Sequence, residues 1–334
     1  MRPAPLALLV LAVLSSACDL SAGLDIETPE HEAAVVVRSV LEAGGAVRVR
    51  VTTSRDPYGP QPEAGAIVYT PSRMDGRVTV VGPDGEEVLE ARPQTCYRVN
   101  QSTCNAETGQ TVRTRAEPYE CGVYQGRAPA EPGQTYTLRV ELPGLETAEA
   151  TVTVPHPPEV VASEQASSPR RRFRFSLADP PGRGDRYALT IFREVDQSRR
   201  SVCRVGGTRD TVVALTTPAA YRSRFDTTDP VLVAAARGAA AIPFMTFPDD
   251  AFDGQTRVFD IEAALDGERE FDTGAVRIQV SSISPVLYDA FQILNFNVDT
   301  NPFAEPQNLP LNVNSGFGRV GAVAVTEVRV ERSP

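Results

Sequence analysis

The clearest group of residues that could do chemistry is an acidic stretch, Asp249-Asp250-Ala251-Phe252-Asp253-Gly254. Closely spaced carboxylates before a glycine turn suit a hard cation such as Ca²⁺, which takes oxygen ligands. The stretch lacks the later glutamate and the full spacing of an EF-hand, so a polar loop without metal is the simpler alternative. Calcium held by Asp249, Asp250 and Asp253 is therefore a weak prediction, and no other cofactor is expected.

Residues for acid-base or nucleophilic catalysis are scarce. The chain has only two histidines, His31 and His156, so a Ser-His-Asp triad or a multi-histidine metal site has little to build from. A carboxylate pair could act as the acid and base of a glycosidase. Because the 43 acidic residues fall mostly on expected turns and strand faces, solvated charge is the simpler interpretation. No catalytic residue is predicted, and we expect a protein that is not an enzyme.

Aromatic side chains allow a ligand-binding rim but do not require one. The sequence contains no tryptophan, so stacking against a sugar would depend on exposed tyrosines. Several tyrosines fall in or beside expected loops of the N-terminal half, where binding residues concentrate. They are Tyr58, Tyr69, Tyr97, Tyr119 and Tyr124. Tyrosines packed at strand ends are the alternative.

The N-terminus has the pattern of an export signal. A positive charge at Arg2, an apolar run over residues 6–14 and small residues before Cys18 predict a signal peptide at residues 1–17. A cysteine after a small residue is what lipoprotein processing needs, although Ser15 makes the motif irregular. We expect Cys18 to carry the lipid and residues 18–32 to form a tether; simple secretion is the alternative. No second apolar stretch is long enough for a transmembrane helix, so the lipid is the expected membrane attachment.

With Cys18 lipidated, four cysteines remain for disulfides: Cys96, Cys104, Cys121 and Cys203. An even number in an oxidising compartment favours two bridges, and four cysteines allow three pairings. Cys104 with Cys121 closes a short loop and leaves Cys96 for Cys203, and this is the preferred pairing. A zinc site is the competing interpretation, but the close cysteine pairs of zinc ribbons are missing.

Length and charge limit the class of protein. At 334 residues the chain exceeds what one core normally serves, so two domains are expected. A hydrophobic content of 41% is ordinary for a globular protein. The net charge of −10 repels phosphate backbones, so nucleic acid is excluded as a partner.

Alternating apolar residues predict a first domain of short strands over residues 33–155. The runs lie at residues 34–41, 47–51, 77–81, 86–89, 135–140 and 148–154. Between the third and fourth runs, Gly82-Pro83-Asp84-Gly85 predicts a hairpin in which Asp-Gly takes positive φ at both turn positions. Many short strands separated by turns favour a β-sandwich.

A second β-rich domain is expected over residues 156–334. Pro155-His156-Pro157-Pro158 cannot continue a sheet and gives the boundary. Strands are predicted at residues 173–177, 187–192, 276–280 and 320–330. One helix is predicted from Ser284 as N-cap and Pro285 at the first position. The fold class is mainly β: two consecutive Ig-like or fibronectin-like β-sandwich domains with one short helix in the second.

The order of these pieces resembles the DUF4249 family of Bacteroidetes-type lipoproteins. The resemblance extends over the mature chain through short motifs. They include Val35-Val36-Val37, Val47–Arg55 before Pro57-Tyr58, Val78–Leu89, Pro132–Tyr136, Val154-Pro155, Phe175–Pro180 before Tyr187, Phe247–Gly254, Asn301-Pro302-Phe303 and Asn312–Gly318. The stretch from Cys96 to Cys121 departs from the pattern as a local insertion.

The resemblance implies an outer-membrane lipoprotein on the periplasmic or cell-surface face, encoded beside a TonB-dependent receptor and serving nutrient uptake. It implies no catalytic residues. We therefore expect a non-enzymatic envelope lipoprotein that binds a ligand or assists such a transporter. A structural or adhesion spacer and a carboxylate-dependent hydrolase are the alternatives.

Overall fold

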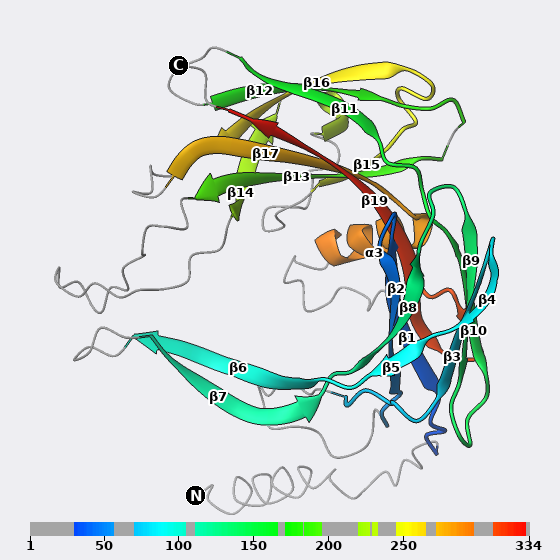
Figure 1. Ribbon diagram of the computed structural model, residues 1–334. Coiled ribbons are helices and arrows are strands. Elements are labelled where there is room, and N and C mark those ends of the chain that lie inside the picture. Colours follow the sequence, from blue (N-terminus) through cyan, green and yellow to red (C-terminus); the bar gives the residue numbers. More distant parts are fainter. Residues whose placement is uncertain are drawn as a thin grey trace, which may run out of the picture. The chain divides into compact units, whose positions relative to one another are not determined.

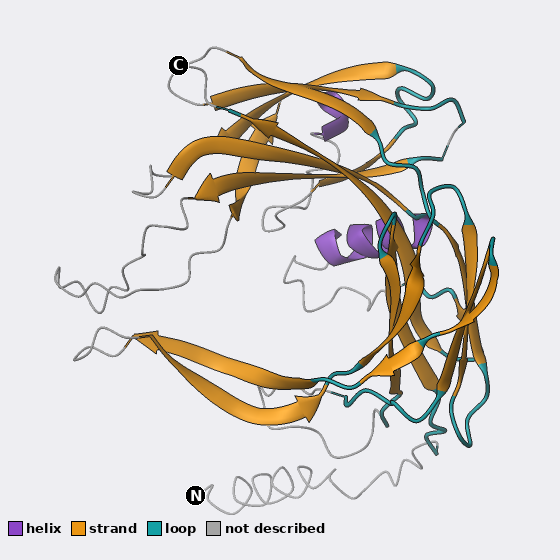
Figure 2. Ribbon diagram, in the orientation of Figure 1, coloured by secondary structure: helices purple, strands orange, loops and turns teal. Residues whose placement is uncertain are grey.

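The computed structural model describes residues 30–56, 70–104, 111–165, 171–182, 184–195, 220–227, 229–232, 245–264, 272–296 and 310–331. Strands dominate these residues, as Figure 2 shows, and the predicted mainly β class is confirmed. The strands and the helix named below belong to one compact unit, residues 34–54 and 68–334. Among the described residues, no helix is long and apolar enough to cross a membrane.

The N-terminal half of the chain supplies ten strands. They are β1 (Val35–Glu42), β2 (Ala46–Thr53), β3 (Arg77–Gly82), β4 (Gly85–Val88), β5 (Glu90–Arg92), β6 (Thr95–Cys104), β7 (Thr111–Glu120), β8 (Val123–Pro129), β9 (Thr135–Glu141) and β10 (Ala148–Thr153). All six alternating runs of this half contain strands in the structure. β1, β2 and β10 show the reason, since each buries the apolar residues of one face.

The C-terminal half adds nine strands and the predicted helix. They are β11 (Glu159–Gln165), β12 (Arg171–Ala178), β13 (Arg186–Val195), β14 (Ala220–Thr227), β15 (Met245–Pro248), β16 (Thr256–Ala264), β17 (Asp272–Ile283), α3 (Pro285–Phe296), β18 (Val313–Asn314) and β19 (Phe317–Val330). Pro285 opens α3 as predicted. The Ser284 hydroxyl accepts a hydrogen bond from the Ala322 N–H at 3.0 Å, so this side chain ties the helix to β19.

The strands form three sheets. A 12-stranded sheet has the order β11-β12-β16-β14-β13-β17-β19-β1-β2-β8-β5, with β15 paired to β13 beside this path. A five-stranded sheet has the order β18-β10-β9-β3-β4, and β6 pairs with β7 alone. The long strand β19, red in Figure 1, pairs in parallel with β1 through residues 317–323 and antiparallel with β17 through residues 323–330. β19 therefore forms hydrogen bonds with a strand from the N-terminal half of the chain, β1, and with a strand from the C-terminal half, β17.

Two hydrophobic clusters lie in this unit. The first is mainly aliphatic and contains residues between Val35 and Val154, together with Val313, Val320 and Ala322. The second is rich in aromatic rings, with Phe175 stacked on Phe259 at 4.8 Å between centroids. Residues 156–334 were all assigned to the second domain from the sequence, but Val313, Val320 and Ala322 pack in the first cluster. Pairing of β19 with β1 places Val320 and Ala322 there, and pairing of β18 with β10 places Val313 there.

Two turns explain glycine-bearing motifs. At Gly318, φ is +113°, and a Cβ there would overlap the carbonyl oxygen of Val37 on β1. The β3–β4 hairpin forms as predicted, with Gly82 paired to Gly85. Its turn differs from the prediction, since Pro83 and Asp84 are the central residues and only Gly85 has positive φ, +106°. Proline fixes φ near −65° and so rules out positive φ at the first turn position.

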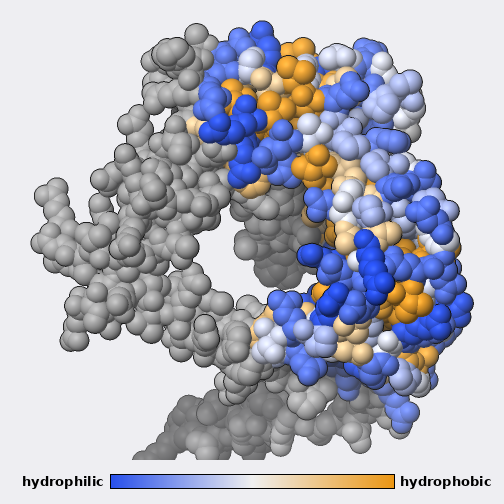
Figure 3. Space-filling model, in the orientation of Figure 1, coloured by the Kyte–Doolittle hydropathy of each residue, from blue (hydrophilic) through white to orange (hydrophobic). Residues whose placement is uncertain are grey.

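The outward face of β11, β12 and β16 carries apolar and charged side chains together. Val161 pairs with Ser176, which pairs with Val258, and the two valines are 72% and 51% exposed. On the same face, two residues along each strand from Ser176 and Val258, Arg174 Nε donates to Asp260 Oδ1 at 2.8 Å. Figure 3 shows orange side chains framed by blue ones over this end of the sheet.

Candidate functional site

Two loops bring four aspartates together. One runs from Asp179 to Asp185, between β12 and β13, and the other from Asp249 to Gln255, between β15 and β16. The Asp249 N–H donates to the Asp185 carbonyl at 3.2 Å, and the Asp179 N–H donates to the Gln255 carbonyl at 3.3 Å. Glycines with positive φ allow these reversals: Gly182, Gly184 and Gly254.

Asp179, Asp249 and Asp253 converge, with one carboxylate oxygen of each within 4.8 Å of the others. Asp179 and Asp249 are buried, and Asp253 is half-buried. The acidic stretch predicted Asp249 and Asp253, but Asp250 is exposed and outside this group. Sequence reasoning missed Asp179 as a ligand and included it only within the Phe175–Pro180 motif.

Backbone and tyrosine donors fix the carboxylates in place. Asp179 accepts hydrogen bonds from the Tyr187 hydroxyl at 2.5 Å and the Gly254 N–H at 2.8 Å. Asp249 accepts from the N–H groups of Gly184 at 3.0 Å and Asp185 at 3.1 Å. The two oxygens of a carboxylate together offer about four acceptor sites, so Asp179 and Asp249 can each accept a further ligand besides these hydrogen bonds.

Asp253 binds the opposite loop, since its Oδ1 accepts from the Gly182 N–H at 2.8 Å. Arg186 brings positive charge, with its Nη1 3.7 Å from Asp249. Burial raises the pKa of Asp185, and the charges of Asp179 and Asp249 raise it further. Burial and the hydrogen bond to Asp179 likewise raise the pKa of the Tyr187 hydroxyl.

The donor set fits calcium. Oxygens that share one Ca²⁺ at 2.3–2.6 Å lie at most about 5 Å apart, and the three aspartate oxygens satisfy this limit. All three donors are hard carboxylate oxygens, which disfavours softer metals. Asp179, Asp249 and Asp253 would hold the ion, which would offset their mutual repulsion.

A cavity of about 770 Å³ opens beside the aspartates. Asp179, Asp185 and Tyr187 line one part of it, and residues 153–159 with Gly133 line another. The His156 imidazole packs against Gly133, where a Cβ would overlap Nε2. The Pro155–Pro158 segment, predicted to be a linker, therefore contributes a cavity wall. Such a volume suits a small-molecule ligand.

The predicted tyrosine rim is not supported where the structure describes it. Tyr124 is only 2% exposed, and its hydroxyl donates to the Gly76 carbonyl at 3.2 Å and accepts from the Gly76 N–H at 3.0 Å. Placing Tyr124 at an exposed rim was therefore wrong, because its ring packs in the first cluster. Tyr119 is half-buried in β7. The side chain of Tyr97 and the whole of Tyr58 and Tyr69 lie outside the described residues.

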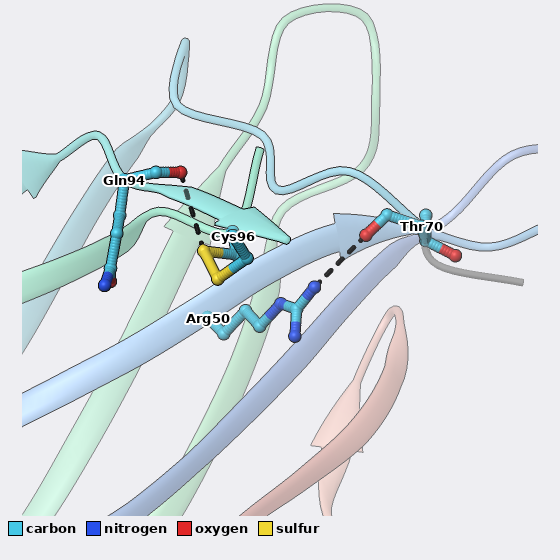
Figure 4. Close-up of a disulfide and its surroundings, with 5 residues drawn as sticks. Arg50, Thr70, Gln94 and Cys96 are labelled. Carbon is cyan, nitrogen blue, oxygen red and sulfur yellow. Dashed lines mark hydrogen bonds between the residues drawn. A yellow bond between two sulfur atoms is a disulfide. The ribbon is translucent and has the colours of Figure 1, made fainter. Parts of the chain in front are cut away.

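Cys96 bonds to Cys121, with 5.7 Å between their Cα atoms (Figure 4). The preferred pairing of Cys104 with Cys121 and Cys96 with Cys203 was wrong. The hairpin register explains why: Cys96 lies opposite Tyr119, two residues before Cys121, whereas Cys104 lies opposite Thr111 at the other end. Figure 4 also shows Arg50 of β2 donating from Nη2 to the Thr70 carbonyl at 3.3 Å. Cys18 and Cys203 lie outside the described residues.

The model of one protein family, described as "Domain of unknown function (DUF4249)", matches residues 23–329. The chain belongs to the DUF4249 family. A search of curated proteins found no match. Among solved structures, the Fcho1 Mu homology domain of Danio rerio with bound Eps15 peptide is similar at 8% identity and a TM-score of 0.21, over 92% of this chain and 98% of that one. At that TM-score the similarity carries no conclusion.

Several motifs that indicated DUF4249 meet at the cavity. Phe247–Gly254 supplies Asp249 and Asp253, and Phe175–Pro180 supplies Asp179. Gly133, from Pro132–Tyr136, and the Val154-Pro155 pair line the cavity. These segments also bond to one another, since the Gly133 N–H donates to the Val154 carbonyl at 2.7 Å.

Proposed function

We propose that this DUF4249 protein is a non-enzymatic lipoprotein of the cell envelope that binds a ligand in the cavity beside Asp179 and Asp185. The observation that carries the proposal is the cavity itself, where the Gly254 N–H and the Tyr187 hydroxyl hold the Asp179 carboxylate in place before any ligand arrives. Preorganised polar groups bind ligands without the cost of ordering them. The polar lining, which includes His156, Glu159 and Ser282, favours a polar ligand.

Calcium is part of the proposal. Asp179, Asp249 and Asp253 would bind Ca²⁺ and fix the loop from Asp179 to Asp185, which borders the cavity, against the loop from Asp249 to Gln255. Calorimetric titration of the purified chain with CaCl₂ after EDTA treatment tests this directly. Heat of binding that disappears in Asp249→Asn supports the site, and a flat titration contradicts it.

Attachment to the outer membrane through acylated Cys18 is the second part, supported by the export signal and by membership of DUF4249. The partner we propose is a TonB-dependent outer-membrane receptor, with a role in nutrient uptake. Detergent-solubilised membranes from the native host provide the test. The tagged protein should carry acyl chains by mass spectrometry and co-purify with a β-barrel receptor. Cys18→Ser should lose the lipid, and a freely soluble, unlipidated native protein would contradict the anchor.

A carboxylate-dependent hydrolase is the second candidate, favoured by one observation. Asp185 has a raised pKa and lines the same cavity as Asp179, so its carboxyl could donate a proton to a ligand bound there. A screen against oligosaccharides and peptides separates the two functions. Turnover that Asp185→Asn abolishes would replace the binding role with catalysis. A spacer role, in contrast, predicts neither turnover nor binding.

A further inference from the structure

A second cavity, of about 440 Å³, lies against the other side of the acidic loop. Among the described residues, β15, β16, helix α3, the acidic loop and the segment Pro230-Val231 build it. The residues that line it are Pro230, Val231, Thr246, Pro248, Asp250, Ala251, Arg257, Tyr288 and Gln292. Asp249 and Asp250 are neighbours in sequence but serve different places, since Asp249 is fully buried in the aspartate cluster and Asp250 is exposed beside this cavity.

The walls of this cavity are fixed by contacts of their own. Tyr288 and Gln292 lie one helical turn apart on α3, so both side chains project from the same face. Gln292 Nε2 donates to Thr246 Oγ1 at 2.9 Å, which ties the helix to β15. The guanidinium of Arg186 lies 5.2 Å from the centre of the Tyr288 ring. The cavity is therefore formed before any ligand binds.

The positive charge of the cavity is already matched. Arg257 Nη2 lies 3.0 Å and 3.2 Å from the two carboxylate oxygens of Asp229. The same guanidinium lies 5.4 Å from the centre of the Phe259 ring. The ion pair with Asp229 offsets the charge that Arg257 would offer to an anion, although among the described residues its buried Nε has no hydrogen-bond partner.

The negative charge at the cavity is not matched in this way. Among the described residues, neither Asp250 nor Asp289 forms an ion pair, and both are exposed. Burial raises the pKa of Tyr288, and the charges of Asp250 and Asp289 raise it further, so both carboxylates act on this ring. Around them the lining is apolar, with Pro230, Val231, Pro248 and Ala251.

We propose that this cavity binds a small organic cation: an ammonium group beside Asp250, carried on an apolar body that packs against Val231, Pro248 and the ring of Tyr288. The cavity volume falls within the range of small-molecule sites, and apolar walls with few polar groups are their usual lining. A carboxylate in a partly apolar site interacts with a cation more strongly than it does in bulk water. This site does not depend on the proposed envelope function or on calcium.

Phenethylamine is the probe, because it joins one ammonium group to one aromatic ring. We would titrate it into the full chain by calorimetry at low salt, beside phenylacetate and 2-phenylethanol, which keep the ring and replace the ammonium. Phenethylamine should bind. The affinity for 2-phenylethanol should be at least tenfold lower, and binding of phenylacetate should be undetectable. No binding of phenethylamine, or equal binding of phenylacetate, would overturn the proposal.

Variants locate the binding. Asp250→Asn should weaken phenethylamine about tenfold, and Ala251→Trp, which places a large side chain at an exposed lining position, should abolish it. Asp84→Asn removes an exposed charge in the β3–β4 turn and should leave the affinity unchanged. If Asp84→Asn weakens binding as much as Asp250→Asn, the amine responds only to net charge and the assignment fails. The melting temperature of each variant is measured as a control, and only variants that melt with the wild type are compared.

Discussion

The Tyr187 hydroxyl donates to Asp179 Oδ1 at 2.5 Å, and both side chains are buried. The tyrosine ring packs with Phe247 and Phe252, at 5.7 Å and 6.1 Å between centroids. One residue thus belongs to the aromatic core and also orients a carboxylate of the proposed calcium site. This contact therefore links the packing of the aromatic core to the orientation of the Asp179 carboxylate.

Tyr187→Phe should lower the free energy of unfolding by about 1–3 kcal/mol, because a buried carboxylate oxygen loses its donor. Urea denaturation measures the loss. Tyr136→Phe is the comparison, since the Tyr136 hydroxyl accepts from the Glu131 N–H at an exposed turn. Water can replace that contact, so its loss should cost less than about 1 kcal/mol. Equal effects would contradict the role given to Asp179.

Calcium should stabilise the protein through Asp179, Asp249 and Asp253 but not through Asp250. At a Ca²⁺ concentration about 100 times the dissociation constant, the expected gain is about 2.7 kcal/mol. Thermal melts in CaCl₂ and in EDTA measure it. Asp249→Asn and Asp253→Asn should remove the shift, and the matched neighbour Asp250→Asn should retain it. If Asp250→Asn also loses the calcium-induced rise in melting temperature, Asp250 is a ligand, as predicted from the sequence.

The raised pKa of Asp185 predicts how stability changes with pH. Burial and the charges of Asp179 and Asp249 hold its folded pKa above the unfolded value. Between these two values the folded state binds more protons, so this group's contribution is fully present below the unfolded pKa and is lost as pH rises through the folded pKa. Asp185→Asn should therefore raise stability at neutral pH relative to acidic pH in calcium-free buffer. Parallel pH profiles for the wild type and the variant would contradict it.

The Cys96–Cys121 bridge should stabilise the base of the β6–β7 hairpin. Its partners are 25 residues apart, and a loop of this size corresponds to about 3.5 kcal/mol in the chain-entropy model. Denaturation of Cys96→Ser/Cys121→Ser against the wild type measures the loss. Non-reducing peptide mapping provides the direct check, and a Cys104–Cys121 peptide in that map would contradict the register of the hairpin.

Gly318→Ala should destabilise the protein far more than Gly144→Ala. Both glycines have positive φ, +113° and +76°, so alanine is strained at each. At Gly144 the added Cβ meets open space, whereas at Gly318 it would overlap the Val37 carbonyl and disturb the pairing of β1 with β19. Gly144→Ala should cost about 1 kcal/mol, and Gly318→Ala several times more by urea denaturation. If the two variants lose similar free energies of unfolding, β19 can move away from β1 at little cost, which would contradict the prediction.

The sequence by itself determined part of the secondary structure, since the predicted runs do not include β5–β8, β11, β14–β16 or β18. Period-two alternation requires one buried face, so runs such as Val47–Val51 and Phe173–Leu177 become strands in almost any tertiary setting. Ser284-Pro285 likewise located the start of α3 within a residue. These signals are local, since they depend on neighbours a few residues apart.

Only the tertiary structure decided which distant residues meet. Strand pairing across the whole chain places Asp179 beside Asp249, gives Cys121 to Cys96 and inserts Val320 into the first core. Spacing in the sequence carries little information on such contacts, because carboxylates 70 residues apart converge only when two loops bond to each other. For the same reason Asp249 and Asp250, neighbours with the same side chain, end in different places. Asp249 is buried in the aspartate cluster and Asp250 is exposed at the smaller cavity, because once the backbone is fixed one side chain turns inward and the next outward.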